Sequence, residues 1–136
     1  MNSSKLKFLV FMAMCLAVIS LCGWMGSGLD GFIDAPTQIS PGADDIVLTG
    51  KDSLEFRWRG AQGARSGHYE FKLYKSYQTT AENLILKEDY QSGIFSAKLP
   101  VNLFEKGQVY TWSLREILID GQRSDYAYSS FKVIEK

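Results

Sequence analysis

The sequence is poor in the residues that build disulfides, metal sites and many catalytic sites. Its 136 residues include only two cysteines, Cys15 and Cys22, and one histidine, His68. Both cysteines lie in an apolar N-terminal run, so the rest of the chain has no thiol for a disulfide or a metal. The stability of the folded part must therefore come from packing.

Arrangements of catalytic residues are missing as well. A Ser-His-Asp triad could be built only around His68, and no Gly-x-Ser-x-Gly turn or glycine-rich phosphate loop is present. Adjacent carboxylates occur at Asp44-Asp45 and Glu88-Asp89, but they lack the spaced oxygen ligands of a calcium loop. The sequence therefore predicts no enzyme, no metal site and no cofactor, and a surface position for His68.

The chain also has no excess charge of either sign. Lys and Arg number 15, and Asp and Glu number 15. Lys5 and Lys7 precede the apolar run, which leaves 13 basic against 15 acidic residues, net −2, in the rest of the chain. This balance gives no electrostatic reason to expect a nucleic-acid partner. The length suits one domain behind a short N-terminal segment.

The most distinctive local feature is the apolar N-terminal segment. Phe8 to Leu29 carries no charge, and as a helix its 22 residues would span about 33 Å, enough for a hydrocarbon core of roughly 30 Å. Lys5 and Lys7 before it predict a cytoplasmic N-terminus. We interpret residues 1–29 as a signal peptide or transmembrane anchor and residues 30–35 as a short linker.

Three fates of this segment remain open: an uncleaved anchor, a cleaved signal peptide, and a lipoprotein signal acylated at Cys22. Ser20-Leu21-Cys22 is only a tolerable cleavage site, and Leu21 stands where a lipoprotein signal has a small residue. The retained anchor is favoured. It predicts a single-pass cell-membrane protein with its C-terminal domain outside the cytoplasm, periplasmic or at the cell surface; the other fates predict a secreted protein or a lipoprotein.

Beyond the linker, apolar residues alternate with polar ones in short stretches, which is typical of half-buried strands. The side chains predicted to point inward in the strongest stretches are Leu54, Phe56, Trp58, Tyr69, Phe71, Leu73, Tyr110, Trp112, Leu114, Phe131 and Val133. Further strands are expected at residues 36–41, continued by 46–49, at 84–90 and at 94–99, the last with Phe95, Ala97 and Leu99 inward. Thr111, Ser113 and Arg115 fall on the opposite, polar face of their strand. Asp120-Gly121 predicts a two-residue hairpin turn, because such turns need positive φ.

About seven short strands with turn signals every 8 to 12 residues predict an all-β fold. The expected architecture is a seven-stranded antiparallel β-sandwich over residues 36–136, preceded by one N-terminal hydrophobic helix.

Four short motifs follow one another along the chain: Ile39-Ser-Pro-Gly, Leu54-Glu-Phe-Arg-Trp58, Tyr69-Glu-Phe-Lys-Leu73 and Phe104-Glu-Lys-Gly-Gln-Val-Tyr110. Over roughly residues 36–133, their spacing resembles an immunoglobulin-like fibronectin type III domain of the kind common in bacterial surface and secreted proteins. The resemblance implies that Tyr110 is the tyrosine-corner residue, with a buried ring and a hydroxyl bound to upstream backbone. Trp58 and Trp112 are the structural partners expected in the core.

Strand counting predicts three loops at the end where the chain enters the domain, namely residues 60–67, 91–93 and 120–125. Arg65 and Arg123 in these loops are candidates for contact with lipid headgroups or a neighbouring membrane protein, with solvated charge as the alternative. The tyrosines that alternation turns outward are Tyr74, Tyr77, Tyr90, Tyr126 and Tyr128. They suit protein or sugar recognition, although tyrosine also pairs across strands on solvated sheet faces.

Together these features predict a non-catalytic, membrane-anchored extracytoplasmic interaction or scaffold module, a subunit of a cell-envelope complex. Its expected partners are other membrane or envelope proteins, and the membrane itself through the N-terminal helix; self-association stays open. The alternatives are a surface filament or adhesin subunit and a carbohydrate-binding module.

Overall fold

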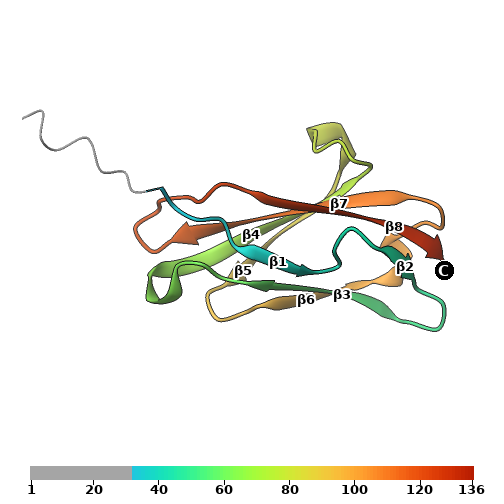
Figure 1. Ribbon diagram of the computed structural model, residues 1–136, viewed down its shortest axis with the longest axis horizontal. Helices are drawn as coiled ribbons and strands as arrows, with labels where there is room; N and C mark the ends of the chain where they lie inside the picture. The colour runs from blue at the N-terminus through green and yellow to red at the C-terminus, as the bar shows by residue number, and fades with distance from the viewer. Residues whose placement is uncertain (1–31) are drawn as a thin grey trace, which may run out of the picture. The chain divides into compact units, whose positions relative to one another are not determined.

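The computed structural model describes residues 32–136, so the predicted N-terminal helix and its membrane anchor lie outside the described residues. The helical turns within residues 32–136 have neither the length nor the hydrophobicity of a membrane span. Residues 33–136 form a compact unit, and the part of the chain that is described contains eight strands and three short 3-10 turns (Figure 1).

The strands form two sheets. One has three strands in the order β1-β3-β6, and the other has five in the order β2-β8-β7-β4-β5. The strand bounds are β1 Thr37–Ser40, β2 Asp45–Val47, β3 Ser53–Arg59, β4 Ser66–Lys75, β5 Leu84–Gln91, β6 Ser96–Pro100, β7 Val109–Leu118 and β8 Ala127–Glu135. The 3-10 turns are η1 Gly63–Arg65, η2 Ala81–Asn83 and η3 Val101–Leu103. The prediction of an all-β sandwich is confirmed.

The first predicted strand is divided between the two sheets. β1 pairs antiparallel with β3, whereas β2 pairs parallel with β8. Pro41 lies between β1 and β2 and has no N–H to donate to a ladder, so regular pairing in the first sheet ends there. The described chain therefore has eight strands rather than seven.

The two sheets share one aromatic core. The centroid of the Phe56 ring lies 5.2 Å from those of Phe71 and Trp112, and 5.9 Å from that of Phe131. Trp58 and Trp112 are both buried. Every side chain predicted to point inward in the strongest stretches is buried: Leu54, Phe56, Trp58, Tyr69, Phe71, Leu73, Tyr110, Trp112, Leu114, Phe131 and Val133.

The predicted inward position of Phe95 is wrong. β6 begins at Ser96, two residues later than the predicted strand, so Phe95 belongs to the preceding loop and its side chain is exposed. Ala97 and Leu99, which lie within β6, are buried as predicted.

Tyr110 forms the corner that the family resemblance implies. Its ring is buried against Phe104, at a centroid distance of 5.1 Å. Its hydroxyl accepts a hydrogen bond from the backbone N–H of Glu105 at 2.7 Å. The side chain therefore fixes the turn that leads into β7.

The polar face of β7 is more buried than its alternation predicts. Thr111 and Ser113 are buried because β7 is the central strand of its sheet, between β4 and β8. The Thr111 hydroxyl lies 2.8 Å from the carbonyl oxygen of Ser76 and 2.7 Å from the Ser130 hydroxyl, both within hydrogen-bonding range. Alternation of polar and apolar residues identifies the two faces of a strand. It does not predict how much of each face the neighbouring strands bury.

Candidate functional site

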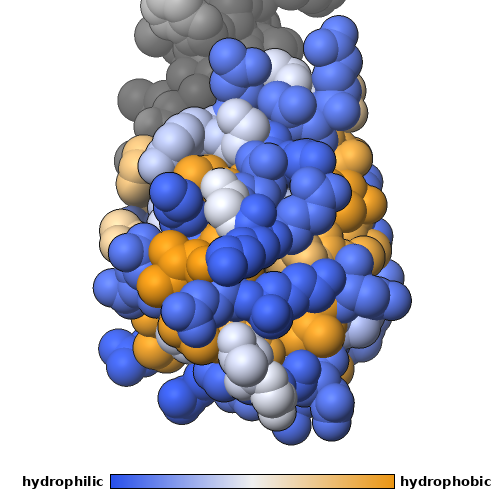
Figure 2. Space-filling view, turned by 90° about the vertical axis from the view of Figure 1, so that its right-hand side faces the viewer, coloured by the Kyte–Doolittle hydropathy of each residue, from blue (hydrophilic) through white to orange (hydrophobic). Residues whose placement is uncertain are grey.

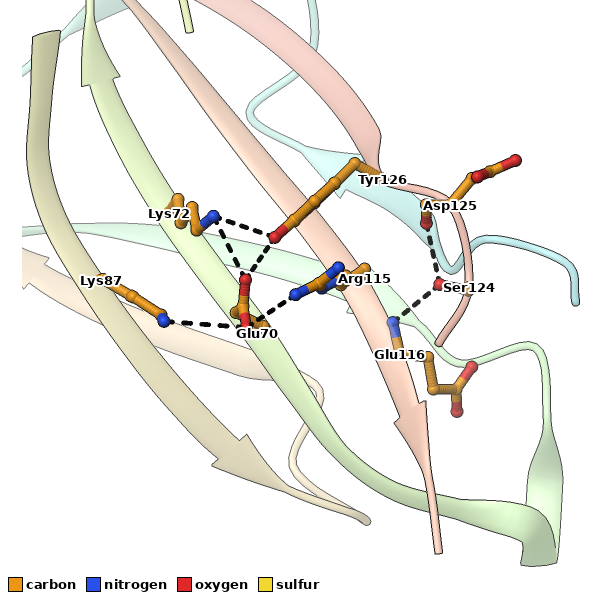
Figure 3. Close-up of polar contacts among 8 residues, drawn as sticks. All are labelled: Glu70, Lys72, Lys87, Arg115, Glu116, Ser124, Asp125 and Tyr126. Carbon is orange, nitrogen blue, oxygen red and sulfur yellow. Dashed lines mark hydrogen bonds and ion pairs between the residues drawn. The ribbon is translucent and has the colours of Figure 1, made fainter. Parts of the chain in front are cut away.

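The outer face of the five-stranded sheet carries three cationic side chains around one buried carboxylate. Glu70 of β4 lies at the centre, and Arg115 Nη2 of β7 donates to its Oε2 at 3.2 Å. Lys72 Nζ lies 3.3 Å from Glu70 Oε1, and Lys87 Nζ of β5 lies 3.9 Å from Glu70 Oε2 (Figure 3). These four residues therefore come from three neighbouring strands. Together with Tyr126, described below, we call them the Glu70 cluster.

Strand register brings these residues together. Glu70 is opposite Arg115 on β7, and Lys72 is opposite Lys87 on β5. Residues two apart in a strand share a face, so Glu70 and Lys72 both point away from the core. Asp89 is opposite Glu70 on β5 and adds a second, exposed carboxylate to this face. Three cations and two carboxylates leave one net positive charge.

Tyr126 completes the cluster from the segment just before β8. Its hydroxyl donates to Glu70 Oε1 and accepts a hydrogen bond from Lys72 Nζ at 2.9 Å. The Arg115 guanidinium carbon lies 4.5 Å from the centroid of its ring, and Lys72 Nζ lies 4.9 Å from it, within the range of cation–π attraction. The Tyr128 ring follows at 5.9 Å from that of Tyr126 and is 55% exposed. Aromatic surface therefore extends from the cluster into solvent.

The cluster keeps its charges fixed at neutral pH. Burial alone would raise the pKa of the Glu70 carboxyl, but hydrogen bonds from Tyr126, Arg115 and Lys72 outweigh it and lower this pKa to about 2. The pKa of Lys72 is raised, mainly by its hydrogen bond with Tyr126. Burial raises the pKa of the Tyr126 hydroxyl, and its bond to Glu70 adds to this effect. Groups held in one protonation state suit binding better than proton transfer at neutral pH.

Two of the five tyrosines predicted to face outward are covered. Tyr74 is only 7% exposed, because it lies in register between Thr111 of the central strand and Leu84 of the edge strand. Tyr90 points inward because it is opposite Tyr69, and its ring lies 5.5 Å from that of Trp58. Neither tyrosine therefore exposes its ring for protein or sugar recognition, and the prediction that they face outward is wrong.

Tyr77 is 71% exposed but lies apart from the Glu70 cluster, in the connection between β4 and β5. It borders an open cleft of about 240 Å³. The residues that line the cleft are Ala43, Asp44, Asp45, Tyr77, Ser130, Phe131 and Lys132. Within residues 32–136 no group of three or more His, Cys, Asp or Glu side chains is placed to hold a metal ion.

Arg65 is the last residue of η1, and Arg123 lies in the connection between β7 and β8. Both connections are at the end of the sandwich where the chain enters, as strand counting predicted (Figure 1). The N–H of Ile119 donates to the carbonyl oxygen of Arg65 at 3.0 Å, and that of Ser92 donates to the carbonyl oxygen of Gly67 at 3.1 Å. We call this surface, formed by residues 60–67, 91–95 and 119–125, the loop end.

Glu116 of β7 holds two of these loops, one through its buried carboxylate and one through its backbone. Glu116 Oε2 accepts a hydrogen bond from the backbone N–H of Ala61 at 3.0 Å. The backbone N–H of Glu116 donates to Ser124 Oγ at 2.9 Å, and that of Ser124 donates to the carbonyl oxygen of Glu116 at 2.9 Å (Figure 3). The loop end is therefore tied to the strands beneath it.

The turn after β7 differs from the predicted two-residue turn. Leu118 and Gln122 close a three-residue loop through the bond from Leu118 N–H to the Gln122 carbonyl oxygen. Gly121 has the positive φ, +87°, that such loops need at their last position. Asp120-Gly121 therefore turns the chain as expected, one residue later in the loop than predicted.

No family model matches the sequence, and a comparison with curated proteins finds no relative. Solved structures with a similar backbone include fibronectin(III)-like modules of Clostridium thermocellum CbhA, 10% identical with a TM-score of 0.51 over 74% of this chain and 96% of theirs. A second, described as a myokine structure, is 17% identical with a TM-score of 0.50 over 75% of this chain and 98% of its own. At such identities the likeness shows the fold alone. That fold is a fibronectin type III-like β-sandwich.

Proposed function

We propose that the protein is a non-catalytic interaction module, held at the cell membrane by its apolar N-terminal segment, with the sandwich outside the cytoplasm as a subunit of a cell-envelope complex. It acts by binding alone. The observation that carries the proposal is the Glu70 cluster, which presents fixed cations and tyrosine rings on the outer face of the five-stranded sheet.

The cluster suits an acidic patch on a protein partner. Lys72 and Arg115 are already held by Glu70, so their side chains lose little further conformational freedom when a partner binds. Lys87 and Tyr128 are exposed and available for direct contact. Tyrosine and arginine are also among the residues that contribute most often to the energy of protein interfaces.

Charge reversal on this face should remove the partner while leaving the sandwich intact. The full chain, extracted with a mild detergent, is expected to co-purify with an envelope protein, and Lys87→Glu or Tyr128→Ala should abolish the association. Quantitative mass spectrometry of the purified material measures the loss. Lys98→Glu makes the same charge change on an exposed residue of β6, in the other sheet, and should retain the partner. A wild-type chain that emerges alone as a monomer would refute the proposal.

Carbohydrate binding is a second candidate, favoured by the cleft beside Tyr77. An exposed tyrosine next to Asp44 and Asp45 combines an apolar ring with hydrogen-bond acceptors, the chemistry that sugars require. Binding of the chain to a glycan array that disappears in Tyr77→Ala, but persists in Lys87→Glu, would favour this candidate over the first.

A further inference from the structure

The loop end exposes apolar side chains that lie outside the buried core. Ile119 is 76% exposed, Phe95 49% and Ile94 43%, and we call these three residues the apolar tip. They come from two loops that connect different strands, residues 92–95 and 119–126. An end of a domain that exposes apolar side chains from separate loops suits a surface that a membrane or a partner covers.

The backbone holds the apolar tip in place. The carbonyl oxygen of Phe95 accepts a hydrogen bond from the N–H of Trp58 at 3.0 Å, and the N–H of Ile94 donates to the carbonyl oxygen of Gln91 at 3.1 Å. Ile119 is fixed by its bond to the carbonyl oxygen of Arg65. These bonds fix the backbone positions from which the three side chains project.

The chain enters the sandwich at this same end. Thr37, the first residue of β1, is opposite Arg59, the last residue of β3, and Gln62 Nε2 donates to the carbonyl oxygen of Asp34 at 3.1 Å. In the sequence, the uncharged run ends at Leu29, and seven residues at full extension reach about 23 Å at ~3.3 Å per residue. If that run spans a bilayer, the loop end is the part of the sandwich with the shortest tether to it.

The charges at and beside the loop end cancel. Arg65, Arg123, Asp120 and Asp125 are exposed in the loop end, and Arg59 and Asp34 are exposed in the strand end and the entering segment next to it. Three positive and three negative side chains give no net attraction to an anionic membrane. Burial of apolar side chains is therefore the main source of affinity for a lipid surface, and the arginines can bind single phosphate groups.

We propose that the loop end is a lipid-contact surface, in which Ile94, Phe95 and Ile119 enter the headgroup region of the bilayer and Arg65 and Arg123 lie beside lipid phosphates. This inference rests on the proposed membrane anchor and names the bilayer as a second partner of the sandwich. The strands then rise from the membrane, and the Glu70 cluster on the sheet face stays open to a protein at its side. The end away from the loop end presents a band of hydrophilic side chains with apolar areas on either side (Figure 2).

The depth of single probes in a bilayer tests this orientation. The full chain, with Cys15→Ser and Cys22→Ser, receives one cysteine at Ile119 or Ile94, labelled with the fluorophore NBD, and is reconstituted in phosphatidylcholine nanodiscs. The expected result is a blue-shifted emission and a loss of intensity when some lipids carry a nitroxide just below the headgroup. Tyr77→Cys is the matched control, because Tyr77 is nearly as exposed as Ile119 and lies at the other end of β4; its probe should be neither shifted nor quenched.

Each other outcome overturns a defined part of the inference. Probes at Ile119 and Tyr77 that behave alike, in chains that stay in the discs, exclude the lipid contact and leave the anchor standing. A blue shift without nitroxide quenching assigns the apolar tip to a protein surface or a second copy. Quenching that appears only after phosphatidylglycerol is added assigns the contact to the arginines. Chains that fail to enter the discs refute the membrane anchor itself.

Discussion

Replacing Phe56 with alanine is expected to lower the free energy of unfolding by about 3–5 kcal/mol, the usual range for removing a large buried aromatic side chain. Phe56 is fully buried and its ring lies between the two sheets, within 6.4 Å of the rings of Phe71, Phe104, Trp112 and Phe131. Alanine would leave a cavity that these four rings can fill only in part.

Urea titration of the full chain, followed by tryptophan fluorescence, measures this change. Glu55→Ala is the matched control, because Glu55 is the preceding residue of β3 and its side chain is exposed. Its substitution should shift the free energy of unfolding by less than about 0.5 kcal/mol, as for most surface positions. Equal losses in the two variants would mean that Phe56 is not at the centre of the core.

Glu70→Gln should be the most destabilising change on the sheet surface, and its effect should depend on pH. Glutamine keeps the shape of the side chain but leaves Lys72 and Arg115 without their charge partner. The pKa of Glu70 falls from 4.5 to about 2 on folding, which corresponds to about 3 kcal/mol of stability at ~1.4 kcal/mol per pKa unit. Because this pKa is lowered, the contribution is fully present above pH 4.5 and is lost as the pH falls towards 2.

Chemical denaturation at a series of pH values separates this effect from a simple loss of packing. The difference between wild type and Glu70→Gln should be large at pH 7 and shrink steadily below pH 4.5. A difference that stays constant down to pH 2 would show that charge is not its cause. Glu55→Gln, on the other sheet, removes an exposed ion pair with Arg57 at 3.7 Å and should change stability little at any pH.

The core could be predicted from the sequence because it depends on local alternation. Leu54, Phe56 and Trp58 point inward whatever strand lies beside them, since the side chains of a strand alternate between its faces. The family motifs added one tertiary contact, the bond between the Tyr110 hydroxyl and the N–H of Glu105. Both kinds of information are carried within a few consecutive residues.

The binding surface could be predicted only in part, because it depends on which strands are neighbours. Tyr126 and Tyr128 were identified as outward-facing, but Glu70 and Arg115 meet only through the pairing of β4 with β7, 45 residues apart in the sequence. The same pairing covers Tyr74, which alternation alone left exposed. Register between distant strands is therefore the missing information.

Glu116 is a second residue whose environment could not be predicted from local sequence. It continues the inward series of Tyr110, Trp112 and Leu114, where an apolar residue would be expected, yet it carries a carboxylate. The N–H of Ala61, from a loop 55 residues away, donates a hydrogen bond to one of its two carboxylate oxygens. No pattern in the sequence around Glu116 predicts a hydrogen-bond donor from so distant a loop.

The central claim is that the outer face of the five-stranded sheet binds a protein partner, and photo-crosslinking in intact cells tests it most directly. A benzophenone amino acid is placed at Tyr128 on this face or, as a control, at Glu55 on the outer face of the three-stranded sheet, both exposed positions. We predict one discrete crosslinked product from position 128 and none from position 55. No product from position 128, or the same products from both positions, would contradict the claim.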